Sequence, residues 1–220
     1  MDDAYILSHV DHTLLAATAS WSQIDKICNE AIKYKTASIC IPPCYVKRAR
    51  ESYKDLNIGT VIGFPLGYDA IAVKAVALQT AISEGADEID MVINITDVKN
   101  GEYDFIKTEI SVLKQIIGPK ILKVIIETCY LTDEEKINMC RIITESRADY
   151  IKTSTGLGTA GATLADIDLF KKHIGPDVKI KAAGGIRTRE DMIAFLEAGC
   201  SRLGTSSAVK ILTGGEAGAY

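Results

Sequence analysis

Asp149-Tyr-Ile-Lys-Thr-Ser-Thr-Gly-Leu-Gly158 reads as a short strand that ends in a lysine and runs into small hydroxylated residues and glycines. Tyr150 and Ile151 favour a strand, and Lys152 stands where that strand ends. A lysine flanked by apolar strand residues is poorly hydrated, which lowers the pKa of its ammonium group. The resulting neutral amine is a nucleophile that can form a Schiff base with a carbonyl. For a lone lysine, the commoner alternative is a side chain that extends past the strand end into solvent.

Strand-like and helix-like segments alternate on both sides of this stretch. The predicted strands lie at residues 9–15, 37–42, 60–64, 88–94, 121–127, 150–152, 178–183 and 201–204. The predicted helices lie at residues 20–35, 45–56, 70–83, 104–117, 132–146, 164–173, from 188 onward, and 206–212. Near-continuous apolar strands that alternate with amphipathic helices indicate a parallel sheet covered by helices.

Eight such units in 220 residues predict an α/β fold, a single (β/α)8 TIM barrel over residues 1–220. The glycine-rich residues 214–220 are predicted to form a flexible tail. An open doubly wound sheet is the alternative, but no Gly-x-Gly-x-x-Gly turn follows an early strand.

The composition argues against a role in binding nucleic acid or anionic membranes. Apolar residues make up 47% of the chain and charged residues 25%, and the formal net charge of −4 argues against nucleic acid or an anionic membrane as partner. No apolar run is long enough to span a bilayer, and the first residues lack the pattern of a signal peptide. The six cysteines form no Cys-x-x-Cys pair, which predicts reduced core residues in a cytoplasmic protein.

Polar residues collect near the predicted strand ends, where barrels carry their active sites: Asp11, Cys40, Asp90, Glu127, Lys152 and Lys181. Side-chain alternation turns Lys152, Lys181 and Asp90 into the barrel. Lys152 and Lys181 end adjacent strands about 5 Å apart, so each ammonium lowers the pKa of the other. A nearby carboxylate can move protons. The alternative is a structural ion pair that closes the barrel top.

Glu88 and Lys179 share the inward faces of their strands but come earlier, so they are expected deeper in the barrel or at its bottom. Cys40 is interpreted as a small wall residue of the barrel mouth, because no histidine is paired with it in the sequence. The three histidines form no His-x-x-x-His pair, so no metal site is predicted.

Two loops after the last two strands resemble a phosphate cradle. They are Gly184-Gly-Ile-Arg187 and Gly204-Thr-Ser-Ser207, and Gly156 offers a third wall. Barrels often bind phosphate with these two loops and a helix N-terminus, where backbone N–H groups meet the anion. Ordinary turn chemistry or a helix N-cap is the alternative explanation for either loop alone.

Taken together, these segments resemble the deoxyribose-phosphate aldolase family, class I aldolases that cleave 2-deoxy-D-ribose 5-phosphate. The resemblance runs along essentially the whole chain and is carried by Asp11-His-Thr-Leu-Leu15, Ser38-Ile-Cys-Ile-Pro42, Val61-Ile-Gly-Phe-Pro-Leu-Gly67, Glu88-Ile-Asp-Met-Val-Ile-Asn94, Glu127-Thr128, Tyr150-Ile-Lys-Thr-Ser-Thr-Gly156, Lys181-Ala-Ala-Gly-Gly-Ile-Arg187 and Arg202-Leu-Gly-Thr-Ser-Ser207. It implies that Lys152 forms the Schiff base and that Asp90 and Lys181 transfer protons.

The resemblance also implies a set of substrate- and phosphate-binding residues: Asp11, Thr13, Cys40, Thr155, Gly156, Gly184, Gly185, Arg187, Gly204, Ser206 and Ser207. It implies that no metal or organic cofactor is needed and that the partners are a phosphorylated sugar, acetaldehyde and copies of the same chain in a dimer or tetramer. Leu157 stands where some members carry a lysine near the phosphate.

Tyr220 ends the chain, as a tyrosine does in some aldolases of this family. It is predicted to fold over the barrel mouth and relay a proton to the enamine carbon, the alternative being a terminus without a role. Two other functions stay open: a phosphate-binding barrel that is not an enzyme, and a Schiff-base aldolase or transaldolase with a longer donor.

Overall fold

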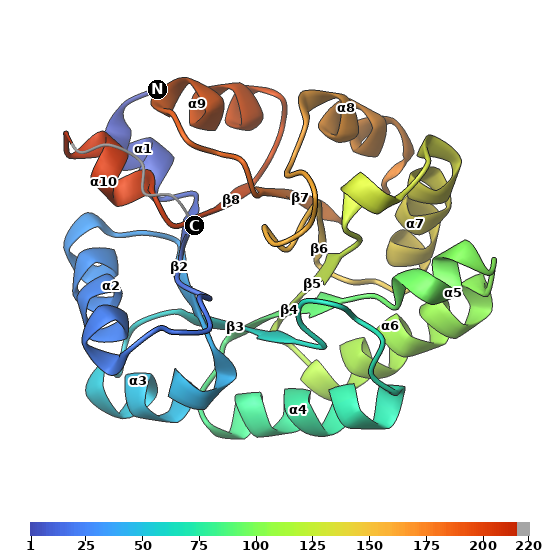
Figure 1. Cartoon of the computed structure of the whole chain (residues 1–220), viewed down its shortest axis with the longest axis horizontal. Helices are drawn as coiled ribbons and strands as arrows, with labels where there is room; N and C mark the ends of the chain where they lie inside the picture. Colours follow the sequence, from blue (N-terminus) through green and yellow to red (C-terminus); the bar gives the residue numbers. More distant parts are fainter. Residues whose placement is uncertain (215–220) are drawn as a thin grey trace.

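The computed structural model describes residues 1–214, so Tyr220 lies outside the described residues. Eight parallel strands close into a barrel in which each strand pairs with its neighbours in chain order (Figure 1). The strands are β1 (Val10–Thr13), β2 (Ser38–Ile41), β3 (Ile58–Ile62), β4 (Glu88–Val92), β5 (Ile121–Ile125), β6 (Tyr150–Lys152), β7 (Lys179–Ala183) and β8 (Arg202–Thr205). Because β1 pairs with both β2 and β8, the predicted TIM barrel is confirmed and the open sheet is excluded.

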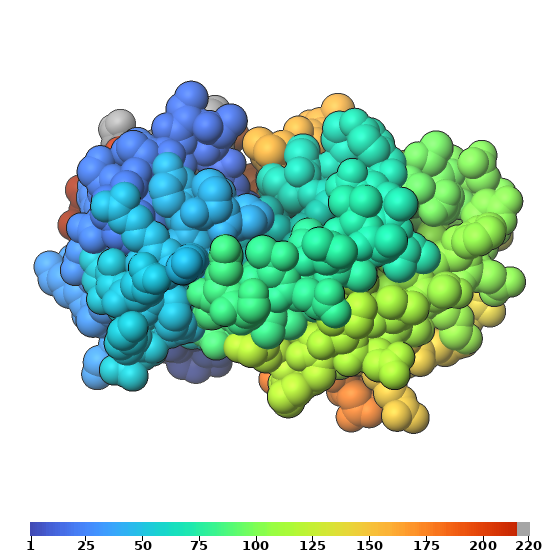
Figure 2. All heavy atoms as spheres, turned by 90° about the horizontal axis from the view of Figure 1, so that it is seen from below, coloured from blue at the N-terminus to red at the C-terminus, as the bar shows by residue number. Residues whose placement is uncertain are grey.

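Helices surround the barrel (Figure 1). They are α1 (Asp3–Leu7), α2 (Trp21–Tyr34), α3 (Val46–Ser52), α4 (Ile71–Ser83), α5 (Ile95–Lys99), α6 (Tyr103–Ile117), α7 (Asp133–Glu145), α8 (Leu164–His173), α9 (Arg189–Glu197) and α10 (Ala208–Leu212), with 3-10 turns at Pro43–Tyr45 and Thr128–Tyr130. In the side view of Figure 2, residues of α3, α4 and α6 form a continuous outer wall. Within residues 1–214, no helix combines the length and apolar character needed to cross a bilayer.

Helix starts follow the capping signals in the sequence. Ser20 with Gln23 and Thr132 with Glu135 form the predicted capping boxes of α2 and α7. The short helices α1 and α5 were not predicted, because five residues are too few for a periodic apolar pattern.

The boundary between α3 and β3 differs from the prediction. The helix ends at Ser52 rather than near residue 56, since Tyr53 leaves the helical conformation at φ −133° and ψ 83°. Strand β3 begins at Ile58 rather than at Thr60. The sequence did not indicate this start because glycine is uncommon inside strands. A Cβ on Gly59 would lie 2.9 Å from the Ile39 carbonyl oxygen, so only glycine allows β2 and β3 to pair so closely.

The two faces of the barrel strands differ in chemistry. Outward-facing residues such as Ile89, Val124 and Ile151 are fully buried and belong to the apolar core beneath the helices. The inward-facing residues of β4 and β5 include Glu88, Asp90 and Lys123, each at most 1% exposed. TIM barrels usually fill their interior with branched apolar side chains. In this barrel, buried charge occupies the interior.

Candidate active site

A cavity opens at the C-terminal ends of the strands. Its lining includes most of the predicted site residues: Thr13, Lys152, Thr155, Gly156, Gly184, Gly185, Arg187, Gly204, Ser206 and Ser207. Leu157, which is 53% exposed, also borders it. The structure thus brings together residues from the ends of four strands, β1, β6, β7 and β8, at the face predicted to be functional.

Lys152 reaches the floor of this cavity. It is the last residue of β6 and only 3% exposed. Strand pairing sets Lys152 beside Lys181 on β7, as the alternation predicted. The Lys152 Nζ donates to Asp90 Oδ2 over 2.7 Å, and the Lys181 Nζ donates to the same oxygen over 2.6 Å. One carboxylate oxygen is therefore shared by two lysines.

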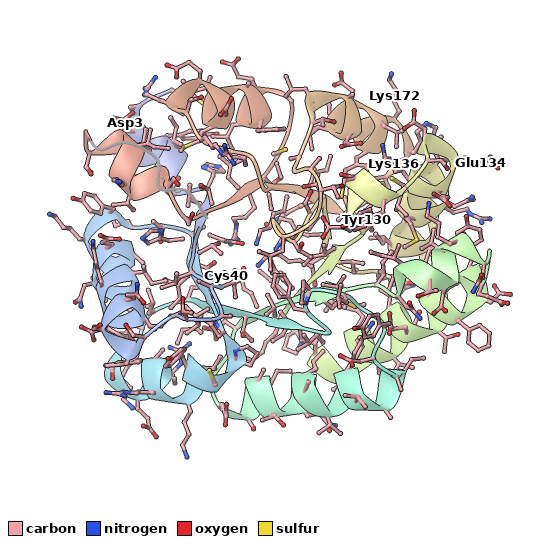
Figure 3. The ribbon with its side chains drawn as sticks, viewed as in Figure 1. Asp3, Cys40, Tyr130, Glu134, Lys136 and Lys172 are labelled. Carbon is pink, nitrogen blue, oxygen red and sulfur yellow. The ribbon has the colours of Figure 1, made fainter. Side chains whose placement is uncertain are left out.

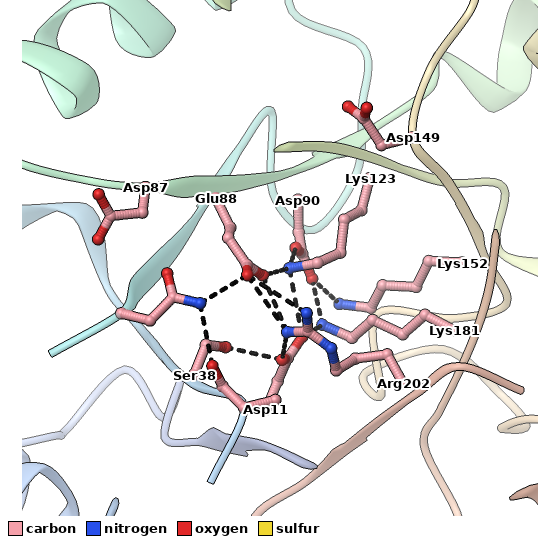
Figure 4. Close-up of polar contacts among 12 residues, drawn as sticks. Asp11, Ser38, Asp87, Glu88, Asp90, Lys123, Asp149, Lys152, Lys181 and Arg202 are labelled. Carbon is pink, nitrogen blue, oxygen red and sulfur yellow. Dashed lines mark hydrogen bonds and ion pairs between the residues drawn. The ribbon is translucent and has the colours of Figure 1, made fainter. Parts of the chain in front are cut away.

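Below Lys152, six side chains of alternating charge form a closed loop of ion pairs (Figure 4). We call this loop the interior charge ring; its members in order are Glu88, Lys123, Asp90, Lys181, Asp11 and Arg202. Each member is at most 9% exposed. The ring holds three carboxylates and three bases, so its net charge is zero when all six are ionised.

One half of the ring runs from β4 through β5. The Lys123 Nζ lies 2.5 Å from Glu88 Oε2 and 2.9 Å from Asp90 Oδ1. It also lies 3.2 Å from Asp11 Oδ2, across the ring. Asn57 supports Glu88 from below by donating its amide to Glu88 Oε1 over 2.7 Å.

The other half runs from β7 through β1 to β8. The Lys181 Nζ lies 2.5 Å from Asp11 Oδ2, and the Arg202 guanidinium donates to Asp11 Oδ1 over 2.5 Å. Arg202 closes the ring at 3.1 Å from Glu88 Oε2. Ser38 donates a further hydrogen bond to Asp11 Oδ1 over 2.7 Å. Gly204 leaves room for this half, because a Cβ there would lie 3.1 Å from the Lys181 Cε.

The three lysines at the cavity floor, Lys123, Lys152 and Lys181, differ in their pKa shifts. Burial alone lowers the pKa of each. For Lys181, Asp11 and Asp90 outweigh burial and raise the pKa; for Lys123, Asp11, Asp90 and Glu88 raise it well above its usual value. Burial lowers the pKa of Lys152, and Asp90 does not compensate because Lys181 is also close. Lys152 is thus shifted toward a neutral amine, in the direction expected from the sequence.

The two aspartates of the ring, Asp90 and Asp11, stay ionised. Burial would raise the pKa of Asp90, but Lys123, Lys152 and Lys181 outweigh it and hold the pKa well below its usual value. Asp11 behaves in the same way, because Lys123, Lys181 and Arg202 lower its pKa against the effect of burial.

The rim of the cavity is built from loops with left-handed glycines. Gly184 and Gly185 have φ values of 78° and 76°, a conformation that favours glycine. The loop before α8 packs onto them so closely that a Cβ on Gly161 would lie 2.3 Å from the Gly184 carbonyl carbon. On the other side, α10 begins at Ala208, two residues later than predicted, and Ser207 N–H donates to Thr205 Oγ1 over 3.1 Å.

Comparison with known proteins identifies the family. The model of the DeoC/LacD family aldolases matches residues 5–214. The chain belongs to the DeoC/LacD aldolase family. It is 62% identical over 221 residues to a deoxyribose-phosphate aldolase of Clostridium botulinum, with 100% of both chains covered. It is 58% identical to the enzyme of that name from Clostridioides difficile, over 94% of this chain and 95% of the other.

Solved structures agree with this assignment. A deoxyribose phosphate aldolase from Aeropyrum pernix, described as tetrameric, superposes with a TM-score of 0.88 at 29% identity, covering 96% of this chain and 91% of that one. The protein is therefore an aldolase and a lyase, which excludes the alternative of a phosphate-binding barrel without enzymatic activity.

Two residues predicted to bind the substrate of this aldolase do not line the cavity. Asp11 is fully buried, and its carboxylate is occupied by Ser38, Arg202 and Lys181. Cys40 on β2, labelled in Figure 3, is 1% exposed, and burial raises the pKa of its thiol to about 11. Direct substrate contact by either residue does not fit this placement. Their position near the predicted strand ends does not indicate how deep the two side chains lie in the barrel.

Glu127 takes a supporting position beside the aldolase cavity. It has a left-handed backbone, with φ 51°, and its carboxylate accepts hydrogen bonds from the Thr155 backbone and from Thr155 Oγ1. Burial raises the pKa of Glu127, even though Thr155 stabilises the ionised form. Glu127 thus holds the loop that carries Thr155 and Gly156 at the cavity wall.

Lys123 and Arg202 are the members of the charge ring that the sequence did not single out. Lys123 pairs in register with Asp90, and Arg202 pairs with Lys181. Side chains an even number of positions apart lie on the same face of a strand. Lys123 precedes Glu127 by an even number of positions, and Arg202 precedes Gly204 in the same way. Alternation could therefore have predicted that both face the barrel interior. Glu88 lies deeper than Asp90, and Lys179 is the exposed first residue of β7 at the bottom of the barrel, so both lie at the predicted depth.

No group of three or more histidine, cysteine, aspartate or glutamate side chains within residues 1–214 is arranged to hold a metal ion. Of the histidines, His12 is buried on the outer side of β1, where its Nε2 contacts Glu30 at 2.7 Å.

Proposed function

We propose that this aldolase reversibly cleaves 2-deoxy-D-ribose 5-phosphate to D-glyceraldehyde 3-phosphate and acetaldehyde through a Schiff base on Lys152. The observation that carries the proposal is the position of Lys152, a buried lysine with a lowered pKa on the floor of a cavity whose rim suits a phosphate. The relatives of 62% and 58% identity that bear the name deoxyribose-phosphate aldolase support the choice of substrate.

Imine formation uses the neutral amine. The Lys152 nitrogen attacks C1 of the open-chain sugar, the resulting carbinolamine loses water, and a protonated imine remains. Asp90 lies 2.7 Å from the Lys152 Nζ, so its ionised carboxylate stabilises the positive charge of the iminium. Lys181, held protonated by Asp11 and Asp90, can donate toward the departing hydroxyl.

Carbon–carbon cleavage then needs a base for the C3 hydroxyl. As that hydroxyl loses its proton, the C2–C3 bond breaks, and its electron pair moves into an enamine with the iminium nitrogen as acceptor. Asp90 and Lys181 are the proton-transfer pair, and a water molecule carries the proton because neither side chain lines the cavity. Protonation of the enamine at C2 and hydrolysis of the imine release acetaldehyde.

The rim loops bind the phosphate. The backbone around Gly184, Gly185 and Gly204 can approach an anion closely, and Ser206 adds a hydroxyl. Arg187 adds positive charge to the same wall. This side of the cavity lies across from β3 and β4 in the barrel order, so the sugar extends from Lys152 toward β7 and β8.

The protein acts as a homo-oligomer in the cytoplasm in this proposal. The oligomer is supported by the relative from Aeropyrum pernix that is described as tetrameric. The six cysteines are all free, as in a reducing compartment.

The test is borohydride trapping with two donors. Incubation with acetaldehyde and borohydride should add the mass of an ethyl group to the peptide that contains Lys152, whereas dihydroxyacetone should give little adduct. Lys179→Ala is the matched control, because Lys179 is an exposed lysine two residues before Lys181. Preferential labelling by dihydroxyacetone would instead favour the aldolase or transaldolase with a longer donor, and a label on Lys181 would reverse the two lysine roles.

A further inference from the structure

Lys152 contacts fewer carboxylates than any base of the interior charge ring. Each ring base contacts at least two carboxylates, while Lys152 contacts only Asp90, which Lys123 and Lys181 already share. Counting charges gives three acids against four bases when Lys152 is protonated. With a neutral Lys152 the cluster is balanced, and buried charge in excess is costly in a medium of low polarity.

Two ring members, Glu88 and Arg202, are not among the residues that line the cavity, and the ion pair of Lys152 is with Asp90 instead. The shortest chain of ion pairs from Glu88 to Lys152 runs through Lys123 and Asp90. Arg202 is one contact farther away, for example along Asp11, Lys181 and Asp90. Both therefore act on the site through charge and through the positions of their neighbours.

We propose that Glu88 and Arg202 are positioning residues that set the charge of the interior ring and thereby the protonation state of Lys152. The inference rests on the proposed role of Lys152 and extends it to residues at the bottom of the barrel. Glu88 supplies a negative charge that favours protonated Lys152, and Arg202 supplies a positive charge that disfavours it.

The groups that act directly on the Lys152 amine are Asp90 on β4, Lys181 on β7, Cys40 on β2 and Glu127 after β5. Asp11 on β1 and Lys123 on β5 lie one contact farther away, since they pair with Lys181 and Asp90 respectively. Glu127 is occupied by Thr155, and the Cys40 thiol is protonated because burial raises its pKa to about 11. The ring charges thus dominate the field at the Lys152 amine.

The experiment compares the pH dependence of imine trapping in Glu88→Gln and Arg202→Met. Glu88→Gln leaves the ring with one extra positive charge, so the acidic limb should move to lower pH. Arg202→Met leaves one extra negative charge, so the limb should move to higher pH. Each shift should be about one pH unit, the size expected for unit charges roughly 10 Å apart at an effective dielectric constant of about 20.

Opposite shifts distinguish this role from a purely structural one, because loss of packing alone would not reverse its sign between two neighbours in one ring. The double variant Glu88→Gln/Arg202→Met restores a neutral ring and should return the limb to the parent position. Arg202→Lys keeps the charge and should also hold the parent profile, even if its rate falls. Shifts in the same direction, or unchanged profiles in both single variants, would overturn the proposal.

A second measurement uses the unaltered protein and does not depend on the folding of the variants. With lysine labelled by carbon-13 at Cε and the signals assigned by substitution, NMR should show that Lys152 titrates below the ordinary lysine range while Lys123 and Lys181 stay protonated into the alkaline range. Titration of Lys123 or Lys181 together with Lys152 would contradict the inference. If the parent protein forms no borohydride adduct at Lys152, the proposed function fails; if it does and the profiles do not shift, only this inference fails.

Discussion

The floor and the rim of the cavity consist of different kinds of residue. On the floor, seven charged side chains, Lys152 and the six ring members, are at most 9% exposed and bind one another. On the rim, glycines and hydroxylated residues make up more than half of the lining, and Arg187 is the charged residue among the lining loops. The floor acts through the protonation states of fixed side chains, whereas the rim acts through backbone groups that position an anion.

This difference predicts which kinetic constant a substitution at the floor or at the rim should change. A buried ion pair that loses one partner leaves an uncompensated charge, which costs about 3–5 kcal/mol. A rim loop that loses a hydroxyl keeps its backbone N–H groups. Floor substitutions should therefore act on kcat and rim substitutions on KM.

Lys152→Ala should produce the largest effect and define the floor. No other lysine among the described residues lines the cavity, so turnover should fall by at least ~10⁴-fold. Steady-state assays with deoxyribose 5-phosphate and borohydride trapping provide the readouts. The control variant Lys179→Ala should keep nearly full activity. Residual imine formation in Lys152→Ala would show that another amine forms the Schiff base.

Asp90→Leu and Lys181→Leu should each lower kcat by roughly 10²- to 10⁴-fold, the usual contribution of proton transfer, with a smaller change in KM. Asp90 is the greater loss for the ring, since its carboxylate serves Lys123, Lys152 and Lys181. The thermal unfolding of both variants should be measured alongside the kinetics to separate a loss of stability from a loss of activity. A raised KM with unchanged kcat would indicate that these residues bind the substrate rather than transfer protons.

Ser206→Asp tests the rim. A carboxylate beside the substrate phosphate should raise KM for deoxyribose 5-phosphate roughly 10- to 100-fold, which corresponds to about 1.4–2.8 kcal/mol. Activity on unphosphorylated deoxyribose should be unchanged. Ser206→Asn is the uncharged control and should cost much less. Equal losses on both substrates would mean that Ser206 does not contact the phosphate.

The pH dependence of imine formation follows from the lowered pKa of Lys152. Burial disfavours the ammonium form, so the neutral amine persists to lower pH than in a free lysine. Below the pKa of Lys152, the trapping rate at fixed acetaldehyde should fall about tenfold per pH unit. N-acetyl-lysine methyl ester is the reference amine. A limb at the same pH as this reference would mean that Lys152 is solvated in solution.

Leu157→Lys should give the smallest effect and sharpen the description of the rim. Leu157 is 53% exposed at the cavity edge, so a lysine there would meet the phosphate in a solvated setting. Exposed ion pairs contribute about 0.2–1 kcal/mol, which predicts a KM that is about 1.4- to fivefold lower. Added salt should remove the gain, and Leu157→Met should show none. A lower KM that salt leaves unchanged would point to packing rather than charge.

Local sequence signals determined most of the fold. Capping boxes at Ser20 and Thr132 located two helix starts, and apolar runs located the eight strands. Alternation then turned Lys152, Lys181 and Asp90 inward, and the structure pairs Lys152 with Lys181 in register. These features depend on a few neighbouring residues, which is why the sequence alone was sufficient for them.

Only the tertiary structure decided which charges share the barrel interior. Asp11 lies 170 positions from Lys181 and 191 from Arg202, and closure between β1 and β8 brings them into contact. The family resemblance implied that Asp11 binds the substrate, but only the structure shows that its carboxylate is held by Ser38, Lys181 and Arg202. The opposite pKa directions of Lys152 and Lys181 have the same origin, because they depend on how many carboxylates barrel closure places around each amine.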